Sequence, residues 1–433
     1  MTDFWLTNGR AHGAVVDGFA EPADQDGFLR LDIRIEDGRI AALAPLGSAA
    51  EGQDLRGGIV FPGFVDAHTH IDKGHIWPRA PNVDGSFLGA LTAVMADRTG
   101  RWTPEDMTAR ADFALRCALA HGTVAIRTHL DTYAEHAPVT WAMFSRLRDA
   151  WAERIALQAS SIAPLDRFWG DEGTMIADTV AQYGGILGMV TRLTGGVHDA
   201  MPDEFQPMLD RFFDLAEARG LDMDLHVDES GETGARALRE IALTAMRRGF
   251  KGRIQCGHCC ALSMQSEDYA IETVKAVADA GIAIVVLPMC NMYLQDRVPH
   301  RTPRWRGVTL VHELAAAGVA VSFASDNTRD PFYAYGDLDM LEVLREATRI
   351  LHLDHPVGAW PAAVSRVPAE VCGFDAGVLR VGAVADLVLT RARMATELQS
   401  RPWHDRVVLR AGKVLDATVP DYAELDSVTG FAG

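Results

Sequence analysis

Short apolar stretches alternate with longer amphipathic stretches through the middle of the chain. Eight of the apolar stretches have the length of a β-strand, and many of them end in histidine or aspartate. They are residues 63–70, 123–131, 154–164, 185–193, 221–229, 252–259, 282–290 and 319–327.

Helical patterns lie between most of these predicted strands. Residues 107–122 and 203–220 are examples, and the second ends in Gly220, a residue typical of helix C-termini. Eight strand-then-helix units predict an α/β fold of the (β/α)8, TIM-like barrel type. The competing arrangement is a doubly wound open sheet. We favour the barrel because no glycine-rich phosphate loop follows the first strand.

The two ends of the chain share a different pattern of short strands and tight turns. Asp37-Gly38 is a hairpin signal near the N-terminus, and Ala411-Gly412 marks a turn near the C-terminus. These ends predict one small β-sandwich built from both termini. The predicted domains are residues 1–61 and 377–433 for the two parts of the sandwich and residues 62–376 for the barrel.

Composition narrows the range of partners. Of the 433 residues, 48% are hydrophobic and 23% charged, as in an ordinary globular protein. The 59 acidic residues outnumber the 41 basic ones, and the net charge of −18 disfavours binding to nucleic acid or to an anionic membrane surface. Six cysteines are too few for a disulfide framework, and we find no secretory signal and no membrane-spanning run. We therefore expect a cytoplasmic protein.

Polar residues at the predicted strand ends are the candidates for chemistry. The carboxyl ends of barrel strands form one rim, so side chains placed there can converge. His68 and His70 are two residues apart on an extended segment and leave its same face. With His226 and Asp326 they make three imidazoles and one carboxylate, a set that suits Zn(II) or Fe(II). We predict one divalent metal ion at this position.

Three further residues lie at the same rim. His129 has three readings: a metal ligand, a neighbour of the ligands or a buried core histidine. His258 is placed to contact substrate or bound water. Glu229 is either a proton shuttle with a raised pKa or a solvated acid that caps the next helix. Cys256 and Cys259 flank His258, but no second pair of cysteines exists at zinc-finger spacing, so we predict small core residues.

The distribution of lysine limits the number of metal ions. The chain has four lysines, and none lies between residues 74 and 250, where the second to fifth strands are predicted. A carboxylated lysine at the end of the fourth strand, which bridges two metals in some barrel hydrolases, is therefore excluded.

Several of these motifs together resemble the amidohydrolase superfamily and, within it, the cytosine deaminase-like branch. The matching segments are PGFVDAHTHIDK, RTHLD, HVDE, GHC, CNMYLQDR and SDNTRDPF, in this order along the chain. The resemblance implies a metal-dependent hydrolytic deaminase of an amino-substituted nitrogen heterocycle, with release of ammonia. It implies a metal site of His68, His70, His226 and Asp326.

The resemblance also implies a course for the reaction. Water bound to the metal loses a proton to Asp326 and attacks the ring carbon that carries the amino group. Glu229 protonates the adjacent ring nitrogen, and His258 polarises the water or the substrate. Proteins of this kind often form homo-oligomers, although no contact surface is evident in the sequence.

Substrate contacts are expected to differ from those of cytosine deaminases. Those enzymes carry a glutamine just after the third strand, where this chain has Pro164 and Leu165, so cytosine itself is disfavoured. Phe332 stands in place of a tryptophan and can stack on a flat ring. Arg192 can offer a forked donor to a carbonyl or carboxylate, or pair with a nearby acid. Asn327 is a further expected substrate contact.

Small heterocycles of the pyrimidine, pterin or triazine type, or creatinine, are therefore the expected substrates. A second hypothesis is hydrolysis of a cyclic amide or of another non-peptide C–N bond. A third is a barrel that binds a ligand without catalysis.

Overall fold

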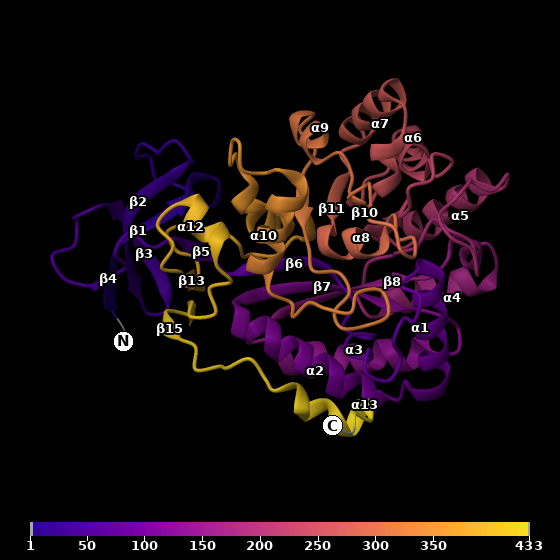
Figure 1. The fold of residues 1–433 in the computed structure, drawn as a ribbon, viewed down its shortest axis with the longest axis horizontal. Helices are drawn as coiled ribbons and strands as arrows, with labels where there is room; N and C mark the ends of the chain where they lie inside the picture. The colour runs from indigo at the N-terminus through magenta and orange to yellow at the C-terminus, as the bar shows by residue number, and fades with distance from the viewer. Residues whose placement is uncertain (1–2, 432–433) are drawn as a thin grey trace. The chain divides into compact units, whose positions relative to one another are not determined.

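The parallel strands of the barrel follow one another in a ring. In the computed structural model, which describes residues 3–431, two sheets provide seven of its strands (Figure 1). The first has the order β6 (Phe64–Thr69), β7 (Thr123–Asp131), β8 (Ala156–Ile162), and the second the order β12 (Val321–Phe323), β11 (Ala283–Val286), β10 (Ile254–His258), β9 (Met223–Val227).

Isolated parallel bridges complete the ring. Residues 186–190 form the eighth segment, since Ile186 pairs with Ser160 of β8 and Val190 pairs with His226 of β9. A further parallel bridge joins Thr69 of β6 to Asp326, three residues beyond β12. The predicted (β/α)8 barrel is confirmed, with a fourth strand reduced to bridges.

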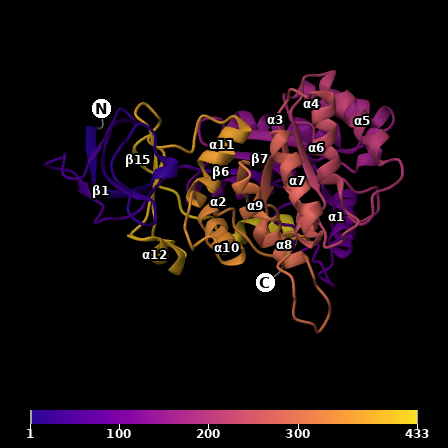
Figure 2. The same cartoon turned by 90° about the horizontal axis from the view of Figure 1, so that it is seen from above.

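Helices connect these strands, as the helical patterns predict. The helices between residues 64 and 387 are α1 (Phe87–Arg101), α2 (Pro104–His121), α3 (Ala137–Trp151), α4 (Asp171–Gln182), α5 (Phe205–Glu217), α6 (Ala237–Arg248), α7 (Glu267–Asp279), α8 (Pro288–Leu294), α9 (Val311–Ala316), α10 (Met340–Leu351) and α11 (Arg366–Cys372). Neighbouring helices such as α3 and α4, and α6 and α7, pack against each other (Figure 2).

Helix α5 illustrates why these segments fold as they do. Its apolar residues at helical spacing, Leu209, Phe212, Phe213 and Ala216, are all buried. The helix ends at Glu217, and Gly220 follows three residues later with a left-handed φ of 63°. The predicted helix is confirmed, and the glycine lies in the turn beyond its end.

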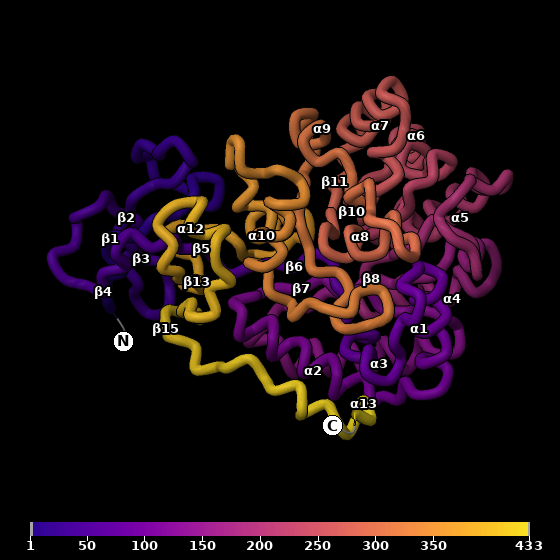
Figure 3. The backbone as a smooth tube through the Cα atoms, viewed as in Figure 1, coloured from indigo at the N-terminus to yellow at the C-terminus, as the bar shows by residue number. Residues whose placement is uncertain are grey.

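The chain ends form a β-sandwich of two four-stranded sheets (Figure 3). One sheet consists of β3 (Arg39–Pro45), β2 (Phe28–Glu36), β1 (Asp3–His12) and β4 (Gln53–Asp54), and the other of β15 (Lys413–Val414), β14 (Val407–Arg410), β13 (Leu387–Leu389) and β5 (Val60–Pro62). Both sheets contribute side chains to one buried cluster, which includes Leu6, Ile33, Leu387 and Leu409. Both termini therefore build one apolar core, as predicted.

Both predicted hairpin turns are present. Asp37 and Gly38 connect β2 to β3 with φ of 48° and 79°, and Ala411 and Gly412 connect β14 to β15 with φ of 44° and 71°. Two positive φ values in a two-residue loop suit the right-handed twist of the paired strands.

The chain divides into two compact units. One comprises residues 3–66, 115–126 and 338–420, and the other residues 67–114, 127–337 and 421–431. The last short helix, α13 (Asp426–Thr429), belongs to the second unit, where the Tyr422 ring lies 5.7 Å from that of Phe113. The domain limits expected from the sequence remain a prediction. The first unit also contains α12 (Ala395–Ser400).

Two expectations from composition also have a structural counterpart. All six cysteines are buried free thiols. Within residues 3–431, no helix has both the length and the apolar character needed to cross a bilayer.

Candidate active site

The strand ends of the barrel bring the four predicted metal ligands together. His68 is the penultimate residue of β6 and His70 follows this strand, while His226 lies in β9 and Asp326 follows β12. All four side chains are buried. The bridge between Thr69 and Asp326 fixes the first and last strands side by side, which places these ligands next to one another.

The ligand atoms of these four residues point at a common centre. The Nε2 atom of His226 lies 3.1 Å from Nε2 of His68 and 3.3 Å from Nε2 of His70. A carboxylate oxygen of Asp326 lies 3.2 Å from Nε2 of His70 and 3.6 Å from Nε2 of His68. The whole set fits the space around one small ion.

The protonation states of the histidines fit a cation at this centre. Burial holds the pKa values of His68, His70 and His226 well below their ordinary value, so the rings are neutral. A neutral ring has one N–H, so each of its nitrogens is either a donor or an acceptor. Nε2 of His226 therefore cannot donate to one of its two Nε2 neighbours and accept from the other. Three converging nitrogens beside a carboxylate are a donor set for a divalent metal.

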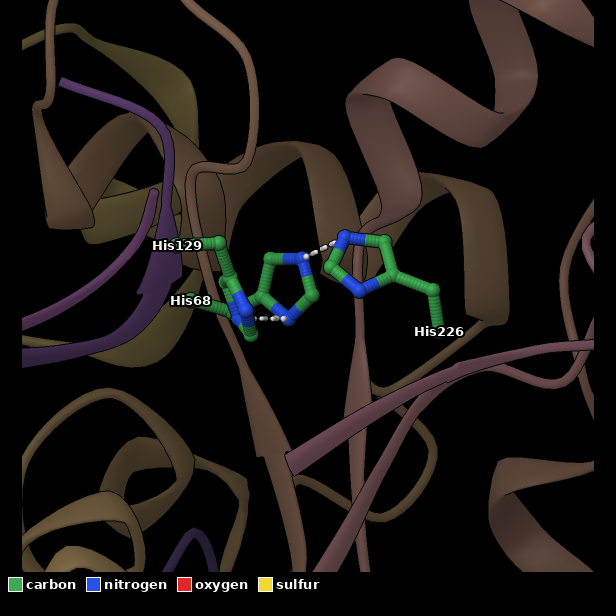
Figure 4. Close-up of side chains that lie close together, drawn as sticks. All are labelled: His68, His129 and His226. Atoms are coloured by element: carbon green, nitrogen blue, oxygen red, sulfur yellow. Dashed lines mark hydrogen bonds between the residues drawn. The ribbon is translucent and has the colours of Figure 1, made fainter. Parts of the chain in front are cut away.

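His129 extends this group on one side (Figure 4). Its Nε2 lies 3.1 Å from Nδ1 of His68, the nitrogen that faces away from the common centre. His68, His129 and His226 also form a trio whose ligand atoms lie within 4.8 Å of one another. His129 is thus buried against a predicted ligand, and its contact fixes the orientation of the His68 ring.

Glu229 and His258 lie together beside the predicted ligands. A carboxyl oxygen of Glu229 is 3.4 Å from Nδ1 of His258, and the Asn291 side-chain amide is 2.9 Å from the same nitrogen. Burial, and then the negative charge of Asp326, raise the pKa of Glu229 well above its ordinary value. The raised pKa favours the protonated form of Glu229, which is a buried residue rather than a solvated helix cap.

Two of these residues have strained backbones. His258 and Asp326 adopt left-handed φ angles of 67° and 62°. Such angles are costly for residues other than glycine and persist where the surrounding structure enforces them, often at functional sites.

A cavity opens beside this group. Its lining includes His70, His226, Glu229, His258 and Asp326. Three of the four expected substrate contacts, Arg192, Asn327 and Phe332, also line it.

Leu165 is not part of the cavity lining. It begins the short 3-10 helix η2 (Leu165–Phe168), where its side chain is fully buried and its backbone N–H donates to carbonyls of Val190 and Arg192. Ile162, at the end of β8, lines the cavity instead. The third strand thus contributes an apolar side chain to the cavity, as the sequence suggests, but the residue is Ile162 and not Leu165.

The sequence analysis did not single out an ion-pair cluster in the same lining. Asp131 accepts from Nζ of Lys73 at 3.1 Å and from Nη1 of Arg98 at 2.6 Å, and all three side chains are buried. Burial raises the pKa of Asp131, but the charges of Lys73 and Arg98 outweigh it and the pKa is lowered. The signal was present in two motifs, since Lys73 closes HTHIDK and Asp131 closes RTHLD.

Comparison with known proteins agrees with this architecture. Residues 51–164 and 103–415 match the amidohydrolase family. A pterin deaminase from Rhizobium rhizogenes is 51% identical over 433 aligned residues, which cover 99% of this chain and 97% of the relative. An N-isopropylammelide isopropyl amidohydrolase from a Pseudomonas species is 24% identical over 84% of this chain and 85% of the relative.

The fold also matches solved structures. A 5-methylcytosine deaminase from Klebsiella pneumoniae, crystallised with 5-fluorocytosine, superposes with a TM-score of 0.79. It is 23% identical in sequence, and the match covers 96% of this chain and 98% of the other.

These matches establish the class of protein. The chain belongs to the amidohydrolase family. It is a hydrolase of non-peptide carbon–nitrogen bonds, and members of its family generally bind a divalent metal ion.

Proposed function

We propose that this protein is a hydrolytic deaminase of pterin-like rings, which removes the exocyclic amino group as ammonia. Deamination of nitrogen heterocycles recurs among its relatives, and the pterin deaminase is similar over nearly the whole length of both chains. The observation that carries the proposal is a cavity lined by converging imidazoles, a carboxylate and Glu229, whose pKa is raised.

The proposed metal site consists of His68, His70, His226 and Asp326. Their nitrogen and carboxylate ligands suit either zinc or iron. A divalent ion held there would lower the pKa of bound water to about 7 and so supply hydroxide at neutral pH.

The side chains around this site accept and donate the protons of the reaction. The carboxylate of Asp326 takes a proton from the attacking water. Glu229, whose raised pKa favours the protonated carboxyl, delivers a proton to the ring nitrogen next to the carbon under attack. Asp326 then passes its proton to the amino group, the carbon–nitrogen bond breaks with release of ammonia, and the hydroxyl proton of the intermediate returns to Glu229. His258, held at Nδ1 by Asn291, is the hydrogen-bonding partner for water or substrate on this side of the cavity.

The aromatic part of the lining suits a flat substrate. The rings of Phe87 and Phe332 lie 5.5 Å apart between centroids and both line the cavity. At the third strand, Ile162 offers no amide to pair with a pyrimidine edge. An aromatic bicycle is therefore favoured over cytosine.

An ammonia-release screen of the metal-replete protein tests this proposal. Pterin, cytosine and a cyclic amide such as hydantoin are supplied in turn, and the products are identified by mass. We expect ammonia from pterin, at a kcat/KM above that for cytosine. Ring-opened product without ammonia would instead support the cyclic-amide hypothesis.

A pair of variants separates catalysis from binding. Glu229→Gln should abolish ammonia release, whereas Glu232→Gln, which changes an exposed acid three residues away, should leave it intact. Pterin binding with no turnover in the unaltered protein would support the non-catalytic hypothesis.

A further inference from the structure

One cation in the cavity lining, Arg192, forms no ion pair with any of the described residues. The side chain of Arg192 is 8% exposed, and its Nε is buried without a hydrogen-bond partner. Of its five N–H donors, one has a described protein acceptor, the carbonyl oxygen of Leu193 at a long 3.3 Å. The guanidinium carbon also lies 5.9 Å from the centre of the Phe87 ring.

The acids near Arg192 are engaged elsewhere. Within residues 3–431, no carboxylate oxygen lies within 4.0 Å of its guanidinium. Asp131 is held between Lys73 and Arg98, and Asp166 accepts from the backbone N–H of Thr194 at 2.8 Å. The Glu229 carboxyl lies against His258, with an oxygen 3.4 Å from Nδ1 of that ring. The salt bridge that the sequence left open as a role for Arg192 is thus not formed.

A buried guanidinium without a counter-ion is unfavourable unless a ligand completes it. Its planar fork matches a carboxylate, which can accept two parallel N–H donations. Arg192 follows Val190, whose backbone pairs with His226 in the next strand, so its fork lies on the segment beside the proposed reaction centre. A ligand that fills the cavity can therefore reach both.

We propose that the preferred substrates carry a carboxylate, and that Arg192 binds it while the amino-bearing end of the ring faces Glu229. The inference rests on the proposed function, because it names the class of heterocycle that the same site accepts. Arg192 is then the specificity-determining residue. A neutral ring without the carboxylate leaves the guanidinium unpaired and binds more weakly.

Two ligands and one inactive background test the inference. Pterin and a pterin with a carboxylate on its second ring are titrated into Glu229→Gln protein, and kcat/KM is measured for both with active protein. We expect the carboxylated ring to be favoured by about 10- to 100-fold, as for hydrogen bonds to charged groups. This ratio should fall to about one in Arg192→Gln and keep an intermediate value in Arg192→Lys.

Arg167→Gln is the matched control. It removes a positive charge from a nearby turn, but Arg167 pairs with Glu172 and does not line the cavity, so the ratio should persist. Equal binding of the two rings, or a preference that survives in Arg192→Gln, would overturn the inference. If the carboxylated ring binds preferentially but neither ring yields ammonia, the proposed function fails and the role of Arg192 stands.

Discussion

Two groups of buried polar residues line the same cavity, and they differ in how their polarity is balanced. In the ion-pair cluster, Asp131 lies between Lys73 and Arg98, so each charge faces an opposite one. In the histidine cluster, neutral nitrogens of His68, His70 and His226 face one another beside a carboxylate. The first group is balanced by the protein's own charges, whereas the second is the group that we propose binds a metal ion.

This contrast teaches that burial alone does not mark a functional residue. A buried charge can be balanced by an opposite charge of the protein. Removing one partner destabilises the fold, because the other charge then stays buried without compensation. Buried polar groups that converge on one point instead of pairing as opposite charges indicate a ligand. Arg192 belongs with the second kind, although it lies in the same lining as Lys73 and Arg98.

Removing the metal should have the largest effect. Dialysis against a chelator is expected to lower kcat by more than about 10⁴-fold, because the pKa of water is then no longer lowered and little hydroxide forms at neutral pH. Adding back zinc or iron should restore activity. His226→Ala should behave like the chelated protein and should not recover with added metal. Full activity in metal-free protein would show that the histidine cluster does not act through a metal ion, and it would contradict the contrast with the ion-pair cluster.

Replacing the proton donor comes next. Glu229→Gln keeps the shape of the side chain but cannot release a proton, so we expect kcat to fall by about 10²- to 10⁴-fold. Metal content, measured by elemental analysis, should be unchanged because Glu229 is not a proposed ligand. A variant with normal kcat would show that another group protonates the ring.

The ion-pair cluster should respond in stability. Lys73→Met leaves Asp131 paired with Arg98 alone and should lower the free energy of unfolding by about 1–3 kcal/mol, measured by urea denaturation. The control is Lys275→Met, which breaks an exposed pair with Asp279 and should cost less than about 1 kcal/mol. Similar losses in both variants would contradict an internally balanced, buried cluster.

The smallest expected effect concerns the aromatic lining. Phe332→Leu keeps apolar volume but removes the ring face, and stacking contributes about 0.5–1.5 kcal/mol. We therefore expect kcat/KM to fall by about 2- to 10-fold, mainly through KM. An unchanged KM would show that the substrate ring does not lie against Phe332.

The sequence predicted the histidine cluster because its members follow a rule of the fold. Strand ends of a barrel meet at one rim, so HTH, HVDE and SDN could be assigned to one site before any coordinates. The convergence of His68 and Asp326 follows from the pairing of first and last strands.

The ion-pair cluster did not follow such a rule. Arg98 lies in helix α1 and not at a strand end, and no local sequence pattern predicts that this helix lines the cavity. Leu165 was expected at the substrate because it follows the third strand, but η2 turns its side chain into the core. The fourth strand is reduced to bridges, and its predicted range contains Gly185 and Gly188, which weaken a strand.

The central claim is that four side chains hold one divalent ion. A crystal structure of the metal-replete protein, with anomalous data collected at the zinc and iron absorption edges, tests it most directly. We predict one anomalous peak about 2.0–2.2 Å from Nε2 of His68, His70 and His226 and from a carboxylate oxygen of Asp326. A peak held by His129 in place of His70 or Asp326, or no peak in active protein, would contradict the account.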